Sequence, residues 1–298
     1  YLLKKEEIID FSANINPYGP PPELKRVLDE SWKEISRYPD PQSSGLRKAL
    51  AEHHGVEMEN ITVGNGASEL IYWISRLFSF PKAVVLSPAF TEYAVAVSLA
   101  GGQVRYVLSD EENDFRHEFS LENLMCLDLP NLVFVGNPNN PTGNSYASST
   151  IQHWIERQLK VSPDTVFVID ESFLPFVGRE TEFSLIPFAA VNAKVIILRS
   201  MTKIFSIPGL RLGYSIAHPD LTLKLSALMP TWRVNILAQR CGEVLFNNSI
   251  FLNNSVSALI KSREELTRAL MYIQQLKVFG SSANFLLLKL LSEQPEAG

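Results

Sequence analysis

The chain has 298 residues, of which 46% are hydrophobic and 20% are charged, and its formal net charge is −5. These values are typical of a folded enzyme with one large and one smaller domain, and they give no reason to expect nucleic acid or an anionic membrane as a partner. No apolar run approaches the roughly 20 residues that a membrane-spanning helix needs.

The two cysteines, Cys126 and Cys241, lie far apart in the sequence and lack the spacing of metal ligands. The simplest interpretation is that both cysteines are reduced thiols of a cytoplasmic protein. The first ten residues carry acidic side chains where a secretory signal peptide would have its apolar core. The sequence therefore predicts a cytoplasmic protein without a metal site.

The segment 10–20 is rich in asparagine, proline and glycine and is not expected to form a regular element. Its Asn14 and Asn16 offer both hydrogen-bond donors and acceptors, so the segment is either an ordered N-terminal arm or a loop at the active site. A helix follows it, and then the proline-punctuated turn 37–41. Within that turn, Tyr38 would ordinarily serve only to cover the backbone.

A strand over 61–63 is followed by a glycine turn and by an apolar helix over 70–78. The backbone amides of Gly66, Ala67 and Ser68 come where the helix starts, and amides there lack partners and attract anions. The two glycines of the turn let the backbone approach a ligand closely. The pattern indicates a phosphate-binding turn, with an ordinary glycine turn as the alternative.

Two further strands, over 82–86 and 132–135, also end in residues suited to a ligand. Phe90 follows the first strand, where its ring either stacks on a flat ligand or packs in the core. The second strand runs into the loop 136–143, which holds three asparagines and two prolines in eight residues. Ligands bind at the carboxyl ends of strands in α/β sheets. This loop, which includes Asn140, therefore favours a functional role over a plain turn.

The strand 166–169 delivers Asp170 to the same edge of the sheet. A carboxylate that leaves a buried strand needs a partner, and a protonated ring nitrogen would supply one. The alternative is a surface aspartate that caps the next turn.

The strand 195–198 leads to Lys203, with the hydroxyl residues Ser200 and Thr202 beside it and Arg211 eight positions later. Hydroxyls and a guanidinium suit a phosphate, and a lysine amine can attack a neighbouring carbonyl to form a Schiff base. Taken alone, Lys203 reads as a solvated loop charge. The interpretation therefore depends on the loops that precede it in the chain.

Beyond residue 218 the pattern turns helical, over 221–228, 235–246 and 250–276. We expect the last of these segments to link the large domain to a smaller one, which contributes a strand over 285–288.

The four loops together resemble those of the fold-type I pyridoxal-phosphate enzymes, the aminotransferase class I/II superfamily. The motifs that carry the resemblance are 137–143, Asp170 with Glu171, and 200–203 with Arg211. It implies an α/β fold with a large cofactor-binding domain over residues 30–225, built on a mostly parallel seven-stranded sheet. Residues 1–29 and 226–298 would form the N-terminal arm and a smaller α+β domain.

The resemblance also implies a role for each site residue toward the cofactor, pyridoxal 5′-phosphate. Lys203 would bind the cofactor aldehyde covalently and move protons, and Asp170 would pair with the ring nitrogen. Asn140 would bind the ring hydroxyl, and Phe90 would stack on the ring. The phosphate would be held by Gly66, Ala67, Ser68, Ser200, Thr202 and Arg211. Tyr38 would reach the cofactor phosphate of a partner subunit, which implies a homodimer with shared active sites, and Asn14 and Asn16 would contact the substrate.

Two features depart from the superfamily. Many aminotransferases place a tyrosine three residues after the aspartate, where this sequence has Phe173. Members also carry, beyond the strand of the small domain, an arginine that binds the substrate carboxylate, and these 298 residues show no equivalent. Either further residues follow Gly298 in the whole protein, or the protein differs from the superfamily at this point.

Within the superfamily the chain is similar to the L-threonine-O-3-phosphate decarboxylases and the histidinol-phosphate aminotransferases. The segments 11–21 and 37–41 look more like the decarboxylases. We therefore expect decarboxylation of L-threonine O-3-phosphate to (R)-1-amino-2-propanol O-2-phosphate, in cobalamin biosynthesis. The alternatives are an aminotransferase acting on histidinol phosphate or an aromatic amino acid, and a catalytically silent binding protein.

Overall fold

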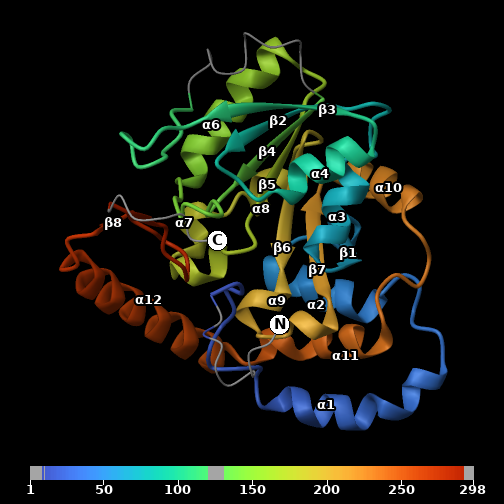
Figure 1. Cartoon of the computed structure of the whole chain (residues 1–298). Helices are drawn as coiled ribbons and strands as arrows, with labels where there is room; N and C mark the ends of the chain where they lie inside the picture. The colour runs from blue at the N-terminus through green and yellow to red at the C-terminus, as the bar shows by residue number, and fades with distance from the viewer. Residues whose placement is uncertain (1–8, 10, 120–130, 292–298) are drawn as a thin grey trace, which may run out of the picture.

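The computed structural model describes residue 9 and residues 11–119 and 131–291. At its centre lies one seven-stranded sheet with the order β1-β7-β6-β5-β4-β2-β3 (Figure 1). The strands are β1 (Ile61–Asn65), β2 (Lys82–Ser87), β3 (Gln103–Leu108), β4 (Leu132–Gly136), β5 (Val166–Asp170), β6 (Val195–Ser200) and β7 (Leu212–Ala217). Strand β7 runs antiparallel to both of its neighbours, and the other pairs are parallel. The predicted mostly parallel sheet is confirmed.

Helices cover both faces of this sheet, which explains why its central strands read as continuous apolar runs. Side chains of a strand alternate between the faces. In β5, Phe167 and Ile169 join the core cluster on one face, while Val166 and Val168 join the cluster on the other. Asp170 continues the second series, so the sheet itself directs its side chain toward that face.

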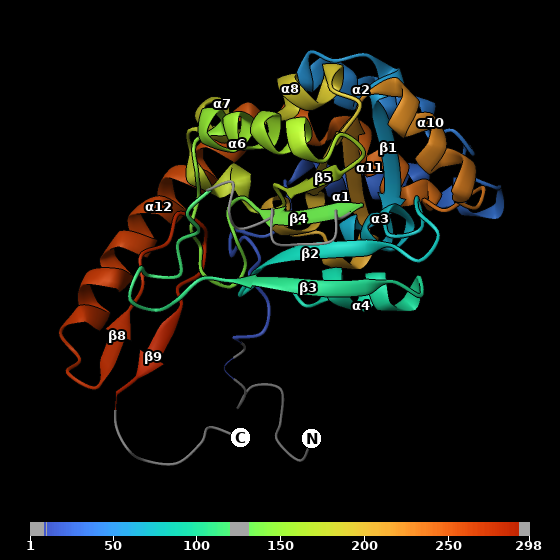
Figure 2. The same cartoon turned by 90° about the horizontal axis from the view of Figure 1, so that it is seen from above.

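The first face is covered by α2 (Ser44–His54), α6 (Ser148–Val161), α8 (Ile186–Val191) and α11 (Ile236–Val244). The second face is covered by α3 (Ala67–Ile74), α4 (Glu92–Leu99) and α10 (Pro219–Leu228). Figure 2 shows α6 and α8 on one side of the sheet and α4 on the other. The remaining elements around this sheet are α1 (Glu23–Ser31), α7 (Glu180–Phe183), α9 (Met201–Ile204) and the 3-10 turns Trp32–Ser36, Met58–Asn60, Leu174–Val177, Pro208–Leu210 and Leu245–Asn247.

The long helix α12 (Ser249–Met271) leads to a second sheet, made of β8 (Leu276–Val278) and β9 (Leu288–Leu290) (Figures 1 and 2). The helix predicted over 70–78 is α3, which begins at Ala67 and ends at Ile74. Two boundaries near the C-terminus also differ from the prediction. The helix ends at Met271 rather than at residue 276, because a turn closed by the Leu276 amide on the Ile273 carbonyl separates it from β8. The predicted strand 285–288 was placed too early, since pairing with β8 begins at Leu288.

Cys241 lies buried in α11 as a free thiol, and Cys126 lies outside the described residues. Among the helices of the described segments, none is long and apolar enough to cross a membrane.

Candidate active site

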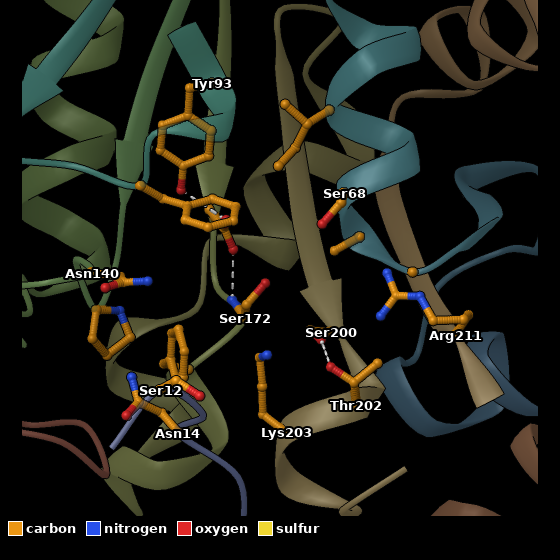
Figure 3. A pocket seen from close by; sticks show the side chains of 17 residues that line it. Ser12, Asn14, Ser68, Tyr93, Asn140, Ser172, Ser200, Thr202, Lys203 and Arg211 are labelled. Carbon is orange, nitrogen blue, oxygen red and sulfur yellow. Dashed lines mark hydrogen bonds between the residues drawn. The ribbon is translucent and has the colours of Figure 1, made fainter. Parts of the chain in front are cut away.

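A cavity of about 190 Å³ opens at the carboxyl ends of β4, β5 and β6 (Figure 3). The sequence-predicted residues that line it are Asn14, Gly66, Ala67, Ser68, Phe90, Asn140, Asp170, Ser200, Thr202, Lys203 and Arg211. Tyr38 and Asn16 do not line it. The loops that follow separate strands therefore meet at one place, as the sheet topology requires.

One end of the cavity gathers groups that can bind an anion. Helix α3 begins at Ala67, directly after Gly66, and the amides of its first turn have no partner within the helix. The Ser200 and Thr202 hydroxyls lie 2.8 Å apart where β6 ends and α9 begins. In Figure 3, Ser68, Thr202 and Arg211 all lie on this side of the cavity. Hydroxyls, free amides and a guanidinium together match a phosphate group.

Gly66 is required at this end for two reasons. Its φ is +85°, a conformation that residues with a side chain rarely adopt, and a Cβ atom there would collide with Nη2 of Arg211. We expect Gly66→Ala to displace the guanidinium and to weaken binding of a phosphorylated cofactor by about tenfold or more, the loss of one charge-assisted hydrogen bond. The measurement is the cofactor dissociation constant.

Gly55→Ala is the matched control for this substitution. Gly55 also has a positive φ, +64°, but a Cβ atom at this position would meet nothing within 4 Å. The control therefore introduces backbone strain without touching the cavity, although the strain is milder than at Gly66, because Gly55 has the left-handed helical conformation that other residues can adopt. Equal losses of cofactor affinity in the two variants would show that strain, and not the place of Arg211, is what matters.

Lys203 lies in α9, one short turn after the end of β6, and its side chain is half-buried. Burial, together with the positive charge of Arg211, lowers the pKa of the Lys203 amine, while Asp170 acts in the opposite direction. The lowered pKa increases the fraction of unprotonated amine near neutral pH. An unprotonated amine is the form that attacks a carbonyl carbon.

Asn16 does not line the cavity but binds the backbone of the segment that carries Lys203. Its backbone amide donates to the Lys203 carbonyl at 3.0 Å, and its side-chain amide donates to the Ile204 carbonyl at 2.9 Å. It is 1% exposed. Of the two asparagines predicted to contact a substrate, the structure brings only Asn14 to the cavity.

Asp170 lies at the end of β5 and its two oxygens have different partners. Oδ2 accepts a hydrogen bond from the Tyr93 hydroxyl at 2.7 Å, and Oδ1 accepts one from the Ser172 amide at 2.9 Å. Sequence reasoning missed Tyr93, although it lies three residues after Phe90, a spacing that places both on one side of a helix start. The two rings meet edge to face, with centroids 5.7 Å apart.

The asparagines of the loop after β4 have two different roles. Asn137 donates to the Tyr146 carbonyl at 3.1 Å, and Asn139 donates to the Pro88 carbonyl at 2.8 Å, so both hold the loop in shape. Asn140 lines the cavity and is the asparagine left to contact a ligand (Figure 3).

A buried ion pair ties the ends of β5 and β6 together behind the cavity. Arg199 and Glu171 have 4% and 0% of their side chains exposed, and Nη2 of the arginine lies 2.6 Å from Oε2 of the glutamate. Arg199 directly precedes Ser200 in the chain, and Glu171 directly follows Asp170. Both Ser200 and Asp170 line the cavity. Sequence reasoning missed this pair too, although an arginine inside an apolar strand needs a buried partner.

Tyr38 lies on the surface, 80% exposed, with its ring tilted against that of Trp232 at a centroid distance of 4.8 Å. It does not reach the cavity of its own chain.

The sequence and the fold of this chain are similar to those of known proteins. The sequence model of the family described as Aminotransferase class I and II matches residues 6–297. A protein of Caldanaerobacter subterraneus subsp. tengcongensis, provisionally named a threonine-phosphate decarboxylase, is 36% identical over 93% of this chain and 74% of its own length. The histidinol-phosphate aminotransferase of Methanocaldococcus jannaschii is 33% identical over 97% of this chain and 77% of its own. The solved histidinol-phosphate aminotransferase of Clostridium acetobutylicum is 28% identical, with a TM-score of 0.86 over 95% of this chain and 83% of its own.

Proposed function

The chain belongs to the aminotransferase class I and II family, whose enzymes use pyridoxal phosphate, and within this family we propose that it decarboxylates L-threonine O-3-phosphate. The product would be (R)-1-amino-2-propanol O-2-phosphate, with release of carbon dioxide, as a step of cobalamin biosynthesis. The proposal includes the role of each cavity residue toward the cofactor.

The cavity matches the cofactor group by group. The start of α3, the hydroxyls of Ser200 and Thr202, and Arg211 suit its phosphate. The amine of Lys203 suits its aldehyde, and the carboxylate of Asp170 suits its ring nitrogen. Asn140 and Phe90 suit the ring hydroxyl and the ring face. When bound, the cofactor supplies an electron sink for the electron pair that a broken bond at the substrate Cα leaves behind.

Decarboxylation replaces the carboxylate on Cα with a proton. The half-buried amine of Lys203 is the group of this chain that we assign to deliver that proton, because proton transfer in such a site needs a group whose pKa lies nearer to neutrality than usual. A transaminase uses the same residues but removes a proton from Cα. Orientation of the substrate therefore separates the two reactions.

The presence of Phe173 in the cavity is the observation on which we propose decarboxylation rather than transamination. It lines the cavity where many aminotransferases have a tyrosine, and it packs edge to face on Phe285 at 4.9 Å. A phenyl ring donates no hydrogen bond, so the environment of the cofactor ring differs from that of a typical aminotransferase. The similarity to the protein from Caldanaerobacter supports the same choice.

An aminotransferase acting on histidinol phosphate is the second candidate, supported by the relative from Methanocaldococcus. Purified protein with added cofactor should be assayed on L-threonine O-3-phosphate alone, and on histidinol phosphate with 2-oxoglutarate. We expect carbon dioxide from the first mixture, with a kcat/KM at least about a hundredfold above that for glutamate formation in the second, as for a site built around one substrate. Glutamate without carbon dioxide would favour the second candidate.

We also propose a homodimer in which Tyr38 contributes to the site of the partner subunit. Its ring is exposed, contacts Trp232 and does not line the cavity of its own chain, so it is available to a second copy. In a two-fold dimer such a contribution is reciprocal, so each site contains residues of both chains.

Mixed dimers test this arrangement. Lys203→Ala and Tyr38→Ala are each expected to lose activity at a cofactor concentration that saturates only the unsubstituted enzyme. Mixing them equally, with subunit exchange, should restore about a quarter of the full activity, since half of the dimers are mixed and each of these has one complete site. Tyr106→Ala, which alters another exposed tyrosine (53% exposed), is the control variant and should retain activity. A mixture no more active than its parents would contradict the shared site.

A further inference from the structure

The hydroxyl of Tyr93 donates to Oδ2 of Asp170 across 2.7 Å, in the interior of the protein (Figure 3). The tyrosine is 2% exposed and the aspartate 9% exposed. The Ser172 amide donates to the other oxygen at 2.9 Å. Both oxygens of the carboxylate therefore have a donor supplied by the protein, and each oxygen has further capacity to accept.

Two ring contacts and a hydrogen bond of the preceding residue fix the position of Tyr93. Its ring stacks on Phe134 of β4, with centroids 5.0 Å apart and planes 11° apart, and it meets Phe90 edge to face. The preceding residue, Glu92, accepts a hydrogen bond from the Tyr72 hydroxyl, which ties the start of α4 to α3. The helix start, the ring and the hydroxyl are thus held in one place relative to the end of β5.

We propose that Tyr93 is a positioning residue for the cofactor, which acts through Asp170 to keep the proton on the ring nitrogen and not on the carboxylate. The inference rests on the proposed role of Asp170 opposite that nitrogen. It adds a residue that lines the cavity but acts on the ring nitrogen through Asp170.

The physical reason is a competition for one proton. A carboxylate and a pyridine nitrogen that face each other share a proton, and the side with the more stable unprotonated form gives it up. Hydrogen bonds to the carboxylate stabilise its negative charge, most strongly when they are short and buried. Two such bonds leave the proton with the nitrogen, where its positive charge strengthens the electron sink of the ring.

Tyr93 remains a donor throughout the useful pH range. Burial and the negative charge of Asp170 raise the pKa of the Tyr93 hydroxyl well above its ordinary value. The aspartate therefore never faces a phenolate, which would repel it.

The alternative is that the bond only satisfies a buried hydroxyl, as most buried tyrosines require. The two explanations differ in what happens at the ring nitrogen. We suggest loading the full chain with cofactor labelled with nitrogen-15 in its ring, and recording the resonance of that nitrogen, which differs clearly between the protonated and the neutral form.

Four proteins should be compared. The unsubstituted enzyme is expected to show the protonated form and Asp170→Asn the neutral form. Tyr93→Phe, which keeps the ring and removes only the hydroxyl, should shift the resonance toward the neutral form. Tyr146→Phe is the matched control, since the hydroxyl of this buried tyrosine accepts from the His117 amide and does not contact Asp170. It should leave the resonance unchanged.

The outcomes separate the two proposals. A resonance in Tyr93→Phe equal to that of the unsubstituted enzyme would overturn the role of Tyr93 alone. A protonated nitrogen in Asp170→Asn would overturn the role of Asp170, and with it both. If Tyr93→Phe does not fold, a crystal structure of the unsubstituted enzyme with bound cofactor decides. The Tyr93 hydroxyl must then still lie within hydrogen-bond distance of Asp170, and a broken contact would contradict the proposal.

Discussion

Replacing Lys203 with alanine is expected to lower the decarboxylation of L-threonine O-3-phosphate by about 10⁴-fold or more. The substitution removes both the amine that holds the cofactor covalently and the group that delivers the proton, and positioned proton transfer alone contributes up to about 10⁴-fold. A second readout does not depend on activity. After reduction with borohydride, the mass of the unsubstituted protein should increase by one cofactor, whereas that of Lys203→Ala should not.

Lys194→Ala is the matched control for this experiment. Lys194 comes just before the opposite end of the same strand, β6, and its amine lies 3.5 Å from an oxygen of the exposed Asp164. Its loss should change neither activity nor labelling. Activity of Lys203→Ala within tenfold of the unsubstituted enzyme, or cofactor fixed to another lysine, would contradict the assignment.

Replacing Arg199 with methionine is expected to lower the free energy of unfolding by about 3–5 kcal/mol, because it leaves the carboxylate of Glu171 buried without its cation. Of its donors among the described residues, Glu171 would keep the Leu185 amide and the Ser184 hydroxyl, at 2.7 and 2.9 Å. Urea denaturation of the cofactor-free protein measures the effect. Replacing Arg199 and Glu171 together by apolar residues should recover part of the loss.

Arg179→Met is the control for the buried pair. Arg179 forms an ion pair with Glu182 at 3.1 Å, but 64% and 55% of these side chains are exposed, so the expected loss is at most about 1 kcal/mol. Should Arg199→Met lose no more stability than Arg179→Met, the buried pair would not be what fixes the ends of β5 and β6.

The sheet could be predicted from the sequence because its strands carry a strong local signal. Strands β4 to β7 are buried along their whole length, and continuous apolar runs bounded by glycine, asparagine and proline mark such strands. The carboxyl ends of parallel strands share one edge, so the residues that follow them could be grouped from their order in the chain alone. Lys203, Asp170 and Asn140 are the clearest examples.

What could not be predicted depends on contacts between residues far apart in the chain. Tyr93 and Asp170 are 77 positions apart, and Asn16 lies 188 positions from the Ile204 carbonyl that it binds. A local pattern assigns neither contact, since the partner is chosen by how a helix or an arm packs on the sheet. The predicted boundary between α12 and β8 was wrong for a different reason. Leucines and isoleucines near residue 273 fit the helix period, and only the turn at Ile273 ends it.

The central claim is that the substrate loses its carboxyl group in this site. L-threonine O-3-phosphate carrying carbon-13 in its carboxyl group should be incubated with the cofactor-loaded full chain, and the label followed by nuclear magnetic resonance. We expect the label to leave as carbon dioxide and bicarbonate, and the phosphorylated amine left behind to carry none. Label retained in a 2-oxo acid that still bears the phosphate would show transamination and would contradict it.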